Sequence, residues 1–119
     1  MAGTGAATSF EAFDVVVVPF PFTDRKASKR RPALVLSTQA FNLASRHSVL
    51  AMITSAEQSR WMGDCAIGDL QAAGLLAPCM ARLKLFTLDQ RLIIRVCGRL
   101  AAADQKRLRA AWKGVLAVP

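Results

Sequence analysis

The sequence predicts a mainly β domain that ends in a helix, built as a small antiparallel barrel or a curled sheet. Five or six short segments are rich in β-branched and aromatic residues, or alternate apolar with charged residues, which is typical of strands. These segments do not alternate regularly with helices, so a parallel sheet with crossover helices is not indicated. Residues 101–116 have helical periodicity, with apolar side chains on one face and cations on the opposite one.

The first half of the chain contains three of these predicted strands. We expect the first over residues 13–20, "FDVVVVPF", with Pro19 confining its end to a sheet edge or a bulge. A basic loop follows, and the second strand is expected over residues 32–37. Residues 38–47 are predicted to hold a turn or a short helix, and a third strand covers residues 48–54.

The second half contains the remaining predicted elements. They are a polar loop at 55–63, a short strand near 64–68, one helical turn at 69–76, a strand at 79–86, a strand at 91–99 and the C-terminal helix. In the strand at 79–86, Arg82 and Lys84 alternate with apolar residues, which gives it one charged face. Residues 87–90 are predicted to form a hairpin connection, so that the next strand pairs back. The apolar face of the helix is formed by Leu108, Ala111, Trp112 and Val115.

The length of 119 residues suits one domain with a single core. We expect residues 1–12 to form a flexible N-terminal tail, because they are rich in small residues and lack the features of a secretory signal. Residues 13–119 are then a single domain. No apolar run approaches the ~18 residues of a membrane span, so no membrane segment is expected.

Cysteine use favours a reducing compartment. Cys65, Cys79 and Cys97 are widely spaced and form no CxxC pair, so neither a zinc site nor a thioredoxin-type redox pair is indicated. We expect buried, reduced thiols and a cytoplasmic protein.

The charge of the chain points to a polyanionic partner. Lys and Arg number 16 against 8 Asp and Glu, a formal net charge of +8. Nucleic acid, an acidic protein and, less favourably, an anionic membrane surface fit this charge. Five of the cations lie within residues 25–31: Arg25, Lys26, Lys29, Arg30 and Arg31. Like charges this close repel each other, which favours a phosphate ligand, although side chains spread into water and paired with nearby carboxylates would also be stable.

Two positions stand out as candidate site residues. Arg31 precedes Pro32, which restricts it to an extended conformation, so its guanidinium should be held more rigidly than those of Arg25 and Lys26. Such a preorganised donor suits stabilisation of a developing charge. Thr54 and Ser55 end an otherwise apolar strand, where a hydroxyl either caps a turn or faces a site.

The common catalytic sets are absent from the sequence. There is no GxSxG, Walker or HExxH motif, and the one histidine, His47, lies in a polar connection where a surface position is expected. Hydrolysis by a metal or by a serine triad is therefore poorly supported.

Taken in order, "DVVVVPFPFTD", "KRRPALVLS", "MITS", "GDLQAAGLLAPCMARLKLFTLD" and "GRL" resemble the PemK/MazF-like toxins of bacterial toxin–antitoxin systems, over residues 13 to about 116. The resemblance implies an SH3-like barrel with a C-terminal helix, the PemK/MazF-like and CcdB-like plasmid-maintenance toxin fold, and a homodimer. It also implies a sequence-specific endoribonuclease without metal or cofactor, an mRNA interferase. Such enzymes cut single-stranded RNA, commonly messenger RNA, by attack of the ribose 2′-hydroxyl, leaving 2′,3′-cyclic phosphate and 5′-hydroxyl ends. The implied protein partner is a cognate acidic antitoxin.

The resemblance assigns the family's arginine before proline to Arg31 and its strand-end threonine to Thr54, as the catalytic pair. The expected RNA-binding residues are Arg25, Lys26, Lys29, Arg30, Ser55, Arg82 and Lys84. Trp61 and Phe22 either stack on unpaired bases or pack in the core or its rim, and neither is assigned to the site. Three positions depart from the family pattern: Lys26 stands where some relatives have a catalytic glutamate, Met52 where a proline is common, and Cys79 where a serine is common. The general base is therefore unassigned.

Two alternatives remain open. A barrel of the same fold could inhibit a protein target such as DNA gyrase and cut nothing, or it could bind RNA or DNA without catalysis. An inactive toxin also fits the departures. Loss of cleavage with retained binding in Arg31→Ala would separate the enzyme from these alternatives.

Overall fold

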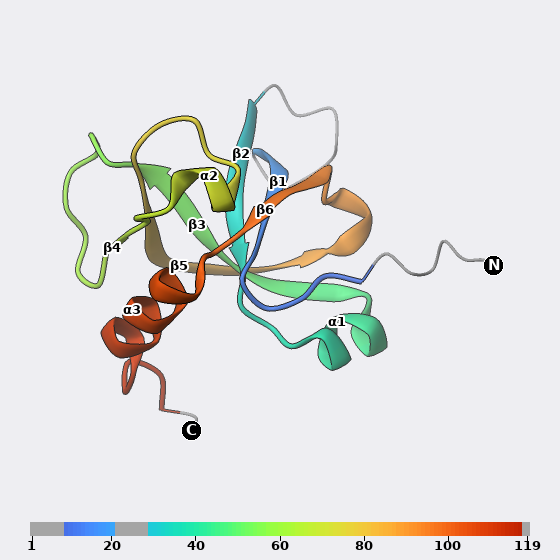
Figure 1. The fold of residues 1–119 in the computed structure, drawn as a ribbon. Helices are drawn as coiled ribbons and strands as arrows, with labels where there is room; N and C mark the ends of the chain where they lie inside the picture. Colours follow the sequence, from blue (N-terminus) through green and yellow to red (C-terminus); the bar gives the residue numbers. More distant parts are fainter. Residues whose placement is uncertain (1–8, 21–28, 118–119) are drawn as a thin grey trace.

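The computed structural model describes residues 9–20 and 29–117, which form one curled antiparallel sheet with helices at its periphery (Figure 1). The strands are β1 Asp14–Phe20, β2 Lys29–Val35, β3 His47–Ser55, β4 Cys65–Ala66, β5 Cys79–Asp89 and β6 Arg95–Arg99. Their order across the sheet is β4-β5-β3-β2-β1-β6. The helices are α1 Gln39–Ser45, α2 Leu70–Ala73, the 3-10 turn η2 Gln90–Leu92 and α3 Ala102–Trp112. The predicted mainly β class, the antiparallel curled sheet and the C-terminal helix are confirmed.

The second strand begins earlier than predicted. β2 starts at Lys29, so Lys29, Arg30 and Arg31 belong to a strand and not to a loop, and it ends at Val35 instead of residue 37. The reason is that β1 continues to Phe20 and pairs with these cations, Val18 with Arg31 and Phe20 with Lys29. Pro32 fits here because β3 does not pair with this part of β2, so no ladder bond requires the missing N–H on that side.

The predicted hairpin between residues 79–86 and 91–99 is wrong. β5 extends to Asp89 and pairs with β3 and β4, while β6 pairs with β1 on the far edge of the sheet, Val15 opposite Gly98. The η2 turn at residues 90–92 directs the chain away from β5, and the N–H of Ile94 then donates to the carbonyl of Val17 at 2.8 Å. β6 therefore completes its hydrogen bonds at the free edge of β1.

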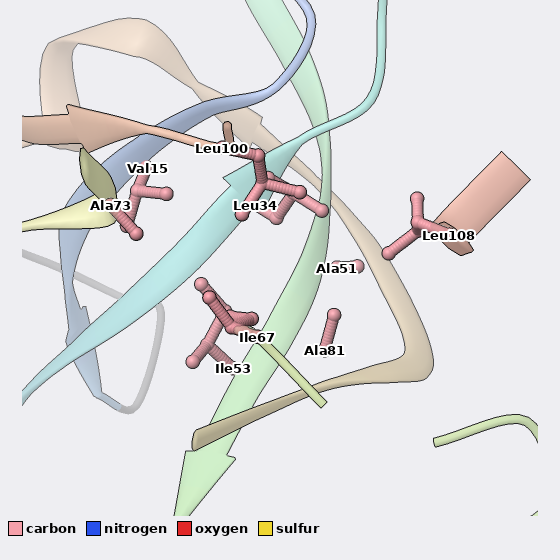
Figure 2. Packing of buried hydrophobic residues seen from close by; sticks show 9 residues of the cluster. All are labelled: Val15, Leu34, Ala51, Ile53, Ile67, Ala73, Ala81, Leu100 and Leu108. Carbon is pink, nitrogen blue, oxygen red and sulfur yellow. The ribbon is translucent and has the colours of Figure 1, made fainter. Parts of the chain in front are cut away.

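One face of the sheet packs against α2, α3 and the residue that follows β4, Ile67. Residues at alternate positions of the strands point to the same face, and Val15, Leu34, Ala51, Ile53 and Ala81 do so here. Ile67, Ala73, Leu100 and Leu108 close over them to complete a buried cluster (Figure 2). The long-range contacts of this cluster unite the N-terminal strands with the C-terminal helix in one core.

The opposite face is covered over only part of its length. Its buried cluster consists of Phe10, Val16, Val18, Ala33, Val35, Leu50, Leu88 and Ile93. Phe10 is 6% exposed and belongs to this core, although it lies in the segment expected to be a flexible tail; residues 1–8 lie outside the described residues. Further along β3 the same alternation continues with Met52 and Thr54, which this cluster does not cover.

The C-terminal helix is shorter than predicted and ends at Trp112. Lys113 is extended, and Gly114 has a φ of +79°, so the helical path is broken there. Of the predicted apolar face, Leu108 is buried and Trp112 is half-buried, while Ala111 and Val115 are exposed. The helix therefore packs through Leu108 and Trp112, which lie one turn apart.

Asp104 connects α3 to the loop before α2. Its carboxylate accepts hydrogen bonds from the backbone N–H of Gly68 and of Asp69, each at 2.9 Å, and forms an ion pair with Arg107. A carboxylate is favoured in the first turn of a helix, but the sequence did not indicate that this side chain would be buried and satisfy two backbone donors of another segment.

Candidate active site

A pocket of about 200 Å³ lies on the incompletely covered face of the sheet. It is lined by Phe20, Arg31, Met52, Thr54, Gln58, Arg82 and Lys84. These residues come from β1, β2, β3 and β5, and from the loop after β3. Two of them, Arg31 and Thr54, are the predicted catalytic pair, so the structure brings this pair to one pocket.

The pocket lies where β2 and β3 stop pairing. Their ladder ends at Ala33 opposite Met52, and two more steps of that register would set Arg31 across from Thr54. Beyond this point β2 pairs only with β1, and β3 only with β5. In Figure 1, β1 and β2 rise together toward the top while β3 runs toward the left. Arg31 of β2 and Thr54 of β3, near this fork, are among the residues that line the pocket.

Arg31 is held against an aromatic ring. Its Cζ atom lies 4.9 Å from the centroid of the Phe20 ring, a cation–π distance that fixes the plane of the guanidinium. Its Nε is buried and has no hydrogen-bond partner among the described residues. An unpaired buried donor costs roughly 1–3 kcal/mol, a cost that an acceptor oxygen brought to it would remove.

Thr54 and Ser55 have different surroundings. Thr54 is half-buried opposite Met80 of β5, and its hydroxyl makes no hydrogen bond within the described part of the chain. Ser55 points to the other face by strand alternation, and its Oγ accepts a hydrogen bond of 3.2 Å from the N–H of Glu57. The turn-capping role that the sequence left open for both residues therefore belongs to Ser55, which does not line the pocket.

Arg82 lines the pocket, but its guanidinium is bound by a neighbouring loop. Nε donates to Asp64 Oδ1 at 3.0 Å and Nη2 to Asp64 Oδ2 at 2.9 Å, while Nη2 also donates to the Ser59 carbonyl at 2.7 Å. The side chains are 10% and 2% exposed, so the pair is shielded from water. The sequence predicted that Arg82 would be free to bind RNA. It did not indicate the ion pair, because strand alternation predicts the face on which a residue lies but not its partner, and Asp64 belongs to no recognisable motif.

The Arg82 contact governs the ionisation of Asp64. The hydrogen bond from the guanidinium lowers the pKa of this carboxyl below 3.8, outweighing the opposite effect of burial, and the N–H of Trp61 adds to the lowering. At neutral pH the loop is therefore attached to β5 by an ionised pair.

Lys84 lines the pocket and contacts Trp61, which is not one of the lining residues. Lys84 is exposed, and its Nζ lies 4.6 Å from the Trp61 ring, while Arg82 Cζ lies 5.7 Å from the same ring. Trp61 remains 45% exposed. Arg82 and Lys84 are the two predicted RNA-binding residues of β5. Of these, only Lys84 has a charged group that forms no ion pair with a carboxylate of the described residues.

The other predicted cations are not part of the pocket lining. Lys29 and Arg30 are exposed on β2; alternation sets Lys29 on the same face as Arg31, and Arg30 on the opposite face. Arg25, Lys26 and Phe22 lie outside the described residues. Phe20, Met52 and Gln58 were not predicted to line a site. Phe20 and Met52 could have been identified only if the pairing register of β1, β2, β3 and β5 had been known.

The pocket is electropositive and suits an anion. Arg31, Arg82 and Lys84 line it, and its described lining contains no carboxylate; Asp64 pairs with Arg82. Within the described residues no group of three or more His, Cys, Asp or Glu side chains could hold a metal ion, and His47 lies at the opposite end of β3 from Thr54.

The half-buried thiols Cys65, Cys79 and Cys97 are free, and burial raises the pKa of each. No described helix is long and apolar enough to cross a membrane.

Solved structures provide close likenesses of the fold. The MazE–MazF complex from Deinococcus radiodurans matches with a TM-score of 0.70 and 19% identity, covering 93% of this chain and 98% of that one. An endoribonuclease in complex with its cognate antitoxin from a mycobacterial species matches with a TM-score of 0.70 and 16% identity, covering 94% and 97%. The toxin MazF-mt6 of Mycobacterium tuberculosis matches with a TM-score of 0.65 and 18% identity, covering 82% and 90%.

No curated protein sequence matches the chain. Residues 11–116 match the family described as the PemK-like, MazF-like toxin of type II toxin–antitoxin systems, which spans nearly all of the sheet and α3. This match agrees with the ordered motifs of the sequence and with the fold of the solved structures. The chain therefore belongs to the PemK/MazF-like toxin family.

Proposed function

We propose that this chain is an endoribonuclease that cleaves single-stranded RNA without a metal ion, as the toxin of a type II toxin–antitoxin system acting in the cytoplasm. The observation that carries the proposal is the meeting of Arg31 and Thr54 at one electropositive pocket, with a buried N–H of Arg31 left without an acceptor among the described residues. A phosphoryl oxygen supplies such an acceptor, and a guanidinium is well suited to phosphate because of its planar set of donors.

The proposed reaction is a transfer within the RNA strand. The 2′-hydroxyl loses its proton and its oxygen attacks the adjacent phosphorus, the bond to the 5′-oxygen of the next nucleotide breaks, and that oxygen takes up a proton. The products are a 2′,3′-cyclic phosphate and a 5′-hydroxyl. Because the nucleophile is the 2′-hydroxyl, DNA is not cut.

Arg31 and Thr54 have distinct roles in this proposal. The Arg31 guanidinium is a donor only, so it stabilises the negative charge that grows on the phosphoryl oxygens. Thr54 donates a hydrogen bond to a phosphoryl oxygen or orients the 2′-hydroxyl. The described pocket lining contains no histidine and no carboxylate, so these residues accelerate the reaction mainly through charge stabilisation and positioning.

RNA binding and partners follow from the charge. Lys84, Lys29 and Arg30 are exposed cations that would contact the RNA backbone, together with Arg25 and Lys26. Arg82 and Ser55 contribute indirectly: Arg82 binds Asp64 of the loop before β4, and Ser55 caps the turn that follows β3. An acidic antitoxin would be attracted to the same surface, and the solved complexes of related toxins support such a partner. We also propose a homodimer and sequence-specific cleavage of messenger RNA.

The test is cleavage of a long single-stranded RNA in EDTA by the wild type and by variants. Arg31→Ala is expected to lower the cleavage rate about 10²–10³-fold, and Thr54→Val by a smaller factor, because each removes a donor aimed at the reacting phosphate. Arg91→Ala is the matched control, since Arg91 is an exposed arginine at the η2 turn that pairs with Asp89. Clean, folded wild-type protein that binds RNA but does not cut it would favour the binding-only alternative.

A further inference from the structure

Trp61 is a large aromatic residue that is both exposed and firmly held. The ring is 45% exposed, whereas its backbone is tied on both sides: its N–H donates to Asp64 Oδ2 at 2.9 Å, and its carbonyl accepts from the Asp64 N–H at 3.1 Å. Asp64 is in turn bound by Arg82. The backbone beneath the exposed indole is therefore fixed to the wall of the pocket.

A second anchor comes from the C-terminal helix. The indole Nε1 of Trp112 donates a 2.7 Å hydrogen bond to the carbonyl of Gly63, within the same loop. The loop containing Trp61 is thus attached to β5 through Arg82 and to α3 through Trp112. A rigid aromatic side chain loses little conformational entropy when a ligand stacks on it.

Two cations of β5 lie close to the Trp61 ring. Lys84 Nζ and Arg82 Cζ lie 4.6 Å and 5.7 Å from the ring centroid. Both residues also line the pocket, so the ring is held next to the cationic pocket. Trp61 nevertheless remains 45% exposed, so part of its side chain is open to a ligand.

We propose that the exposed face of Trp61 is a stacking platform for one unpaired base of the RNA whose backbone lies in the pocket, an inference that rests on the proposed function. An aromatic face interleaved with cations is the arrangement that binds single-stranded nucleic acid: bases stack on the ring and phosphates contact the charges. Lys84 serves both purposes, because it lines the pocket and contacts the ring.

In this proposal the catalytic residues and Trp61 have different roles. Arg31 and Thr54 hold the scissile phosphate, and Trp61 holds a base beside it, which restricts the angle at which the strand enters the pocket. Since every base has a π-face, stacking on Trp61 selects unpaired RNA without selecting one base. Paired RNA cannot present a free face, so the platform also accounts for a single-strand preference.

The test uses ligands that cannot be cut, so that binding is measured apart from catalysis. A short single-stranded 2′-deoxy oligonucleotide is compared with an abasic oligomer of equal length, which carries the same phosphates and no bases. Trp61→Leu is expected to weaken binding of the base-bearing oligomer roughly 5- to 150-fold, the range for loss of one stacked base. Binding of the abasic oligomer is expected to stay the same, and Trp61→Phe to restore most of the affinity for the normal one.

A matched control is available in Phe41, which is 44% exposed on α1, beside the start of β3 and away from Thr54. Phe41→Leu should change neither affinity. Fluorescence gives a second readout, because the chain has only two tryptophans: quenching by the base-bearing oligomer is expected in the wild type and should be lost in Trp61→Phe, where only Trp112 remains.

Equal weakening of the normal and the abasic oligomers in Trp61→Leu would overturn the platform, because it would show a loop or charge effect. So would unchanged oligonucleotide binding combined with weaker binding of an acidic protein partner, which would place the ring in a protein interface. These binding results do not depend on cleavage. If the wild type cleaves RNA but Trp61→Leu leaves oligonucleotide binding unchanged, only the platform is contradicted. If the oligomer quenches the fluorescence of the wild type but the wild type does not cleave RNA, only the proposed enzyme is contradicted.

Discussion

Arg31 combines three properties that are seldom found together in a surface arginine. It lies on a strand paired on one side, its guanidinium is stacked near the Phe20 ring, and its Nε is buried without a partner among the described residues. The stacking fixes the plane of the donors, and the unpaired N–H makes the site more stable when an acceptor enters. A side chain in this state is prepared to bind an oxyanion, at the expense of some stability in the free protein.

This geometry predicts that charge alone is not sufficient at position 31. Arg31→Lys keeps the positive charge but loses the planar donor set and the Nε–H. We therefore expect the RNA affinity to fall only slightly, whereas the cleavage rate should fall at least about 10-fold. Separate measurement of RNA binding and of single-turnover cleavage checks this. A lysine variant that cleaves at the wild-type rate would show that a point charge performs the role of Arg31.

Asp64 gives a prediction for pH. Its folded pKa lies below the usual 3.8, so the ionised carboxylate stabilises the fold at pH values above about 4, and this contribution is lost as the pH falls through the folded pKa. Asp64→Asn should therefore lower the free energy of unfolding at pH 7 and have a smaller effect near pH 3. Urea unfolding at the two pH values measures this.

Glu57→Gln, in the same exposed loop, is the control, since the Glu57 side chain makes no hydrogen bond within the described residues and the substitution should be nearly neutral at both pH values. A destabilisation by Asp64→Asn that is equally large at pH 3 would contradict the role of the ionised pair.

Among single residues, the sequence predicted the positions of Arg31 and Thr54 because local rules apply to them. A residue before proline is extended, and a polar residue at the end of an apolar strand marks a sheet edge. It did not predict that Arg82 is paired, because Asp64 approaches from a loop whose course depends on Trp112 of α3. Charge–charge partners separated along the chain have no local signal.

At the level of elements, α2 and β6 are in direct backbone contact through glycines. Gly74 ends α2 with a φ of +73°, and a Cβ built there would lie 1.9 Å from the carbonyl oxygen of Cys97 on β6. Gly98 of β6 approaches Ala73 in the same way, with 2.4 Å between a Cβ and the Ala73 carbonyl carbon. A glycine is common at the end of a helix, but the second reason for a glycine at position 74 appears only once β6 lies against α2.

Gly74→Ala tests this contact, and Gly114→Ala is the matched control. Gly114 has a similar φ of +79°, and a Cβ added there would meet no described atom within 4 Å, so this variant carries the backbone strain without the clash. We expect Gly114→Ala to cost at most about 1–2 kcal/mol of unfolding free energy, and Gly74→Ala to cost clearly more. Equal effects in urea unfolding would show that the α2–β6 contact can relax.

Strand pairing was the least predictable property of the elements. Each strand was recognisable from its β-branched or alternating residues, yet the partner of β6 was not, because residues 91–99 satisfy local hairpin rules equally well. The actual pairing with β1 follows the η2 turn, after which the N–H of Ile94 donates to the carbonyl of Val17. Likewise β2 extends into the cations because β1 continues past Pro19, a long-range effect that overrides the unfavourable clustering of charge.

For the whole molecule, the net charge of +8 is the property most closely linked to a polyanionic ligand. RNA binding should weaken steeply with salt, with a slope in log K against log salt of about 0.7 for each phosphate neutralised on a single strand. Lys84→Ala should lower this slope by about one phosphate, whereas Arg91→Ala should leave it unchanged. A slope near zero would contradict an electrostatic RNA surface.

Family membership was the feature of the whole molecule that the sequence revealed best. The ordered motifs extend over nearly the entire domain, and each occupies a structural position that the fold requires, such as the strand end at Phe20 and the start of the buried part of β2 after Pro32. Features that depend on the assembled sheet, including the two-sided core and the pocket at the fork of β2 and β3, could be described only from the structure.

The proposed attack by the 2′-hydroxyl is tested most directly by cleavage of an RNA in EDTA, followed by analysis of the new ends and of a substrate with a single 2′-deoxyribose at the cut site. We expect discrete fragments with 5′-hydroxyl ends and no cut at the 2′-deoxy position, since the attacking oxygen is missing there. Cleavage that persists at the 2′-deoxy position, or that leaves 5′-phosphate ends, would contradict the proposed chemistry.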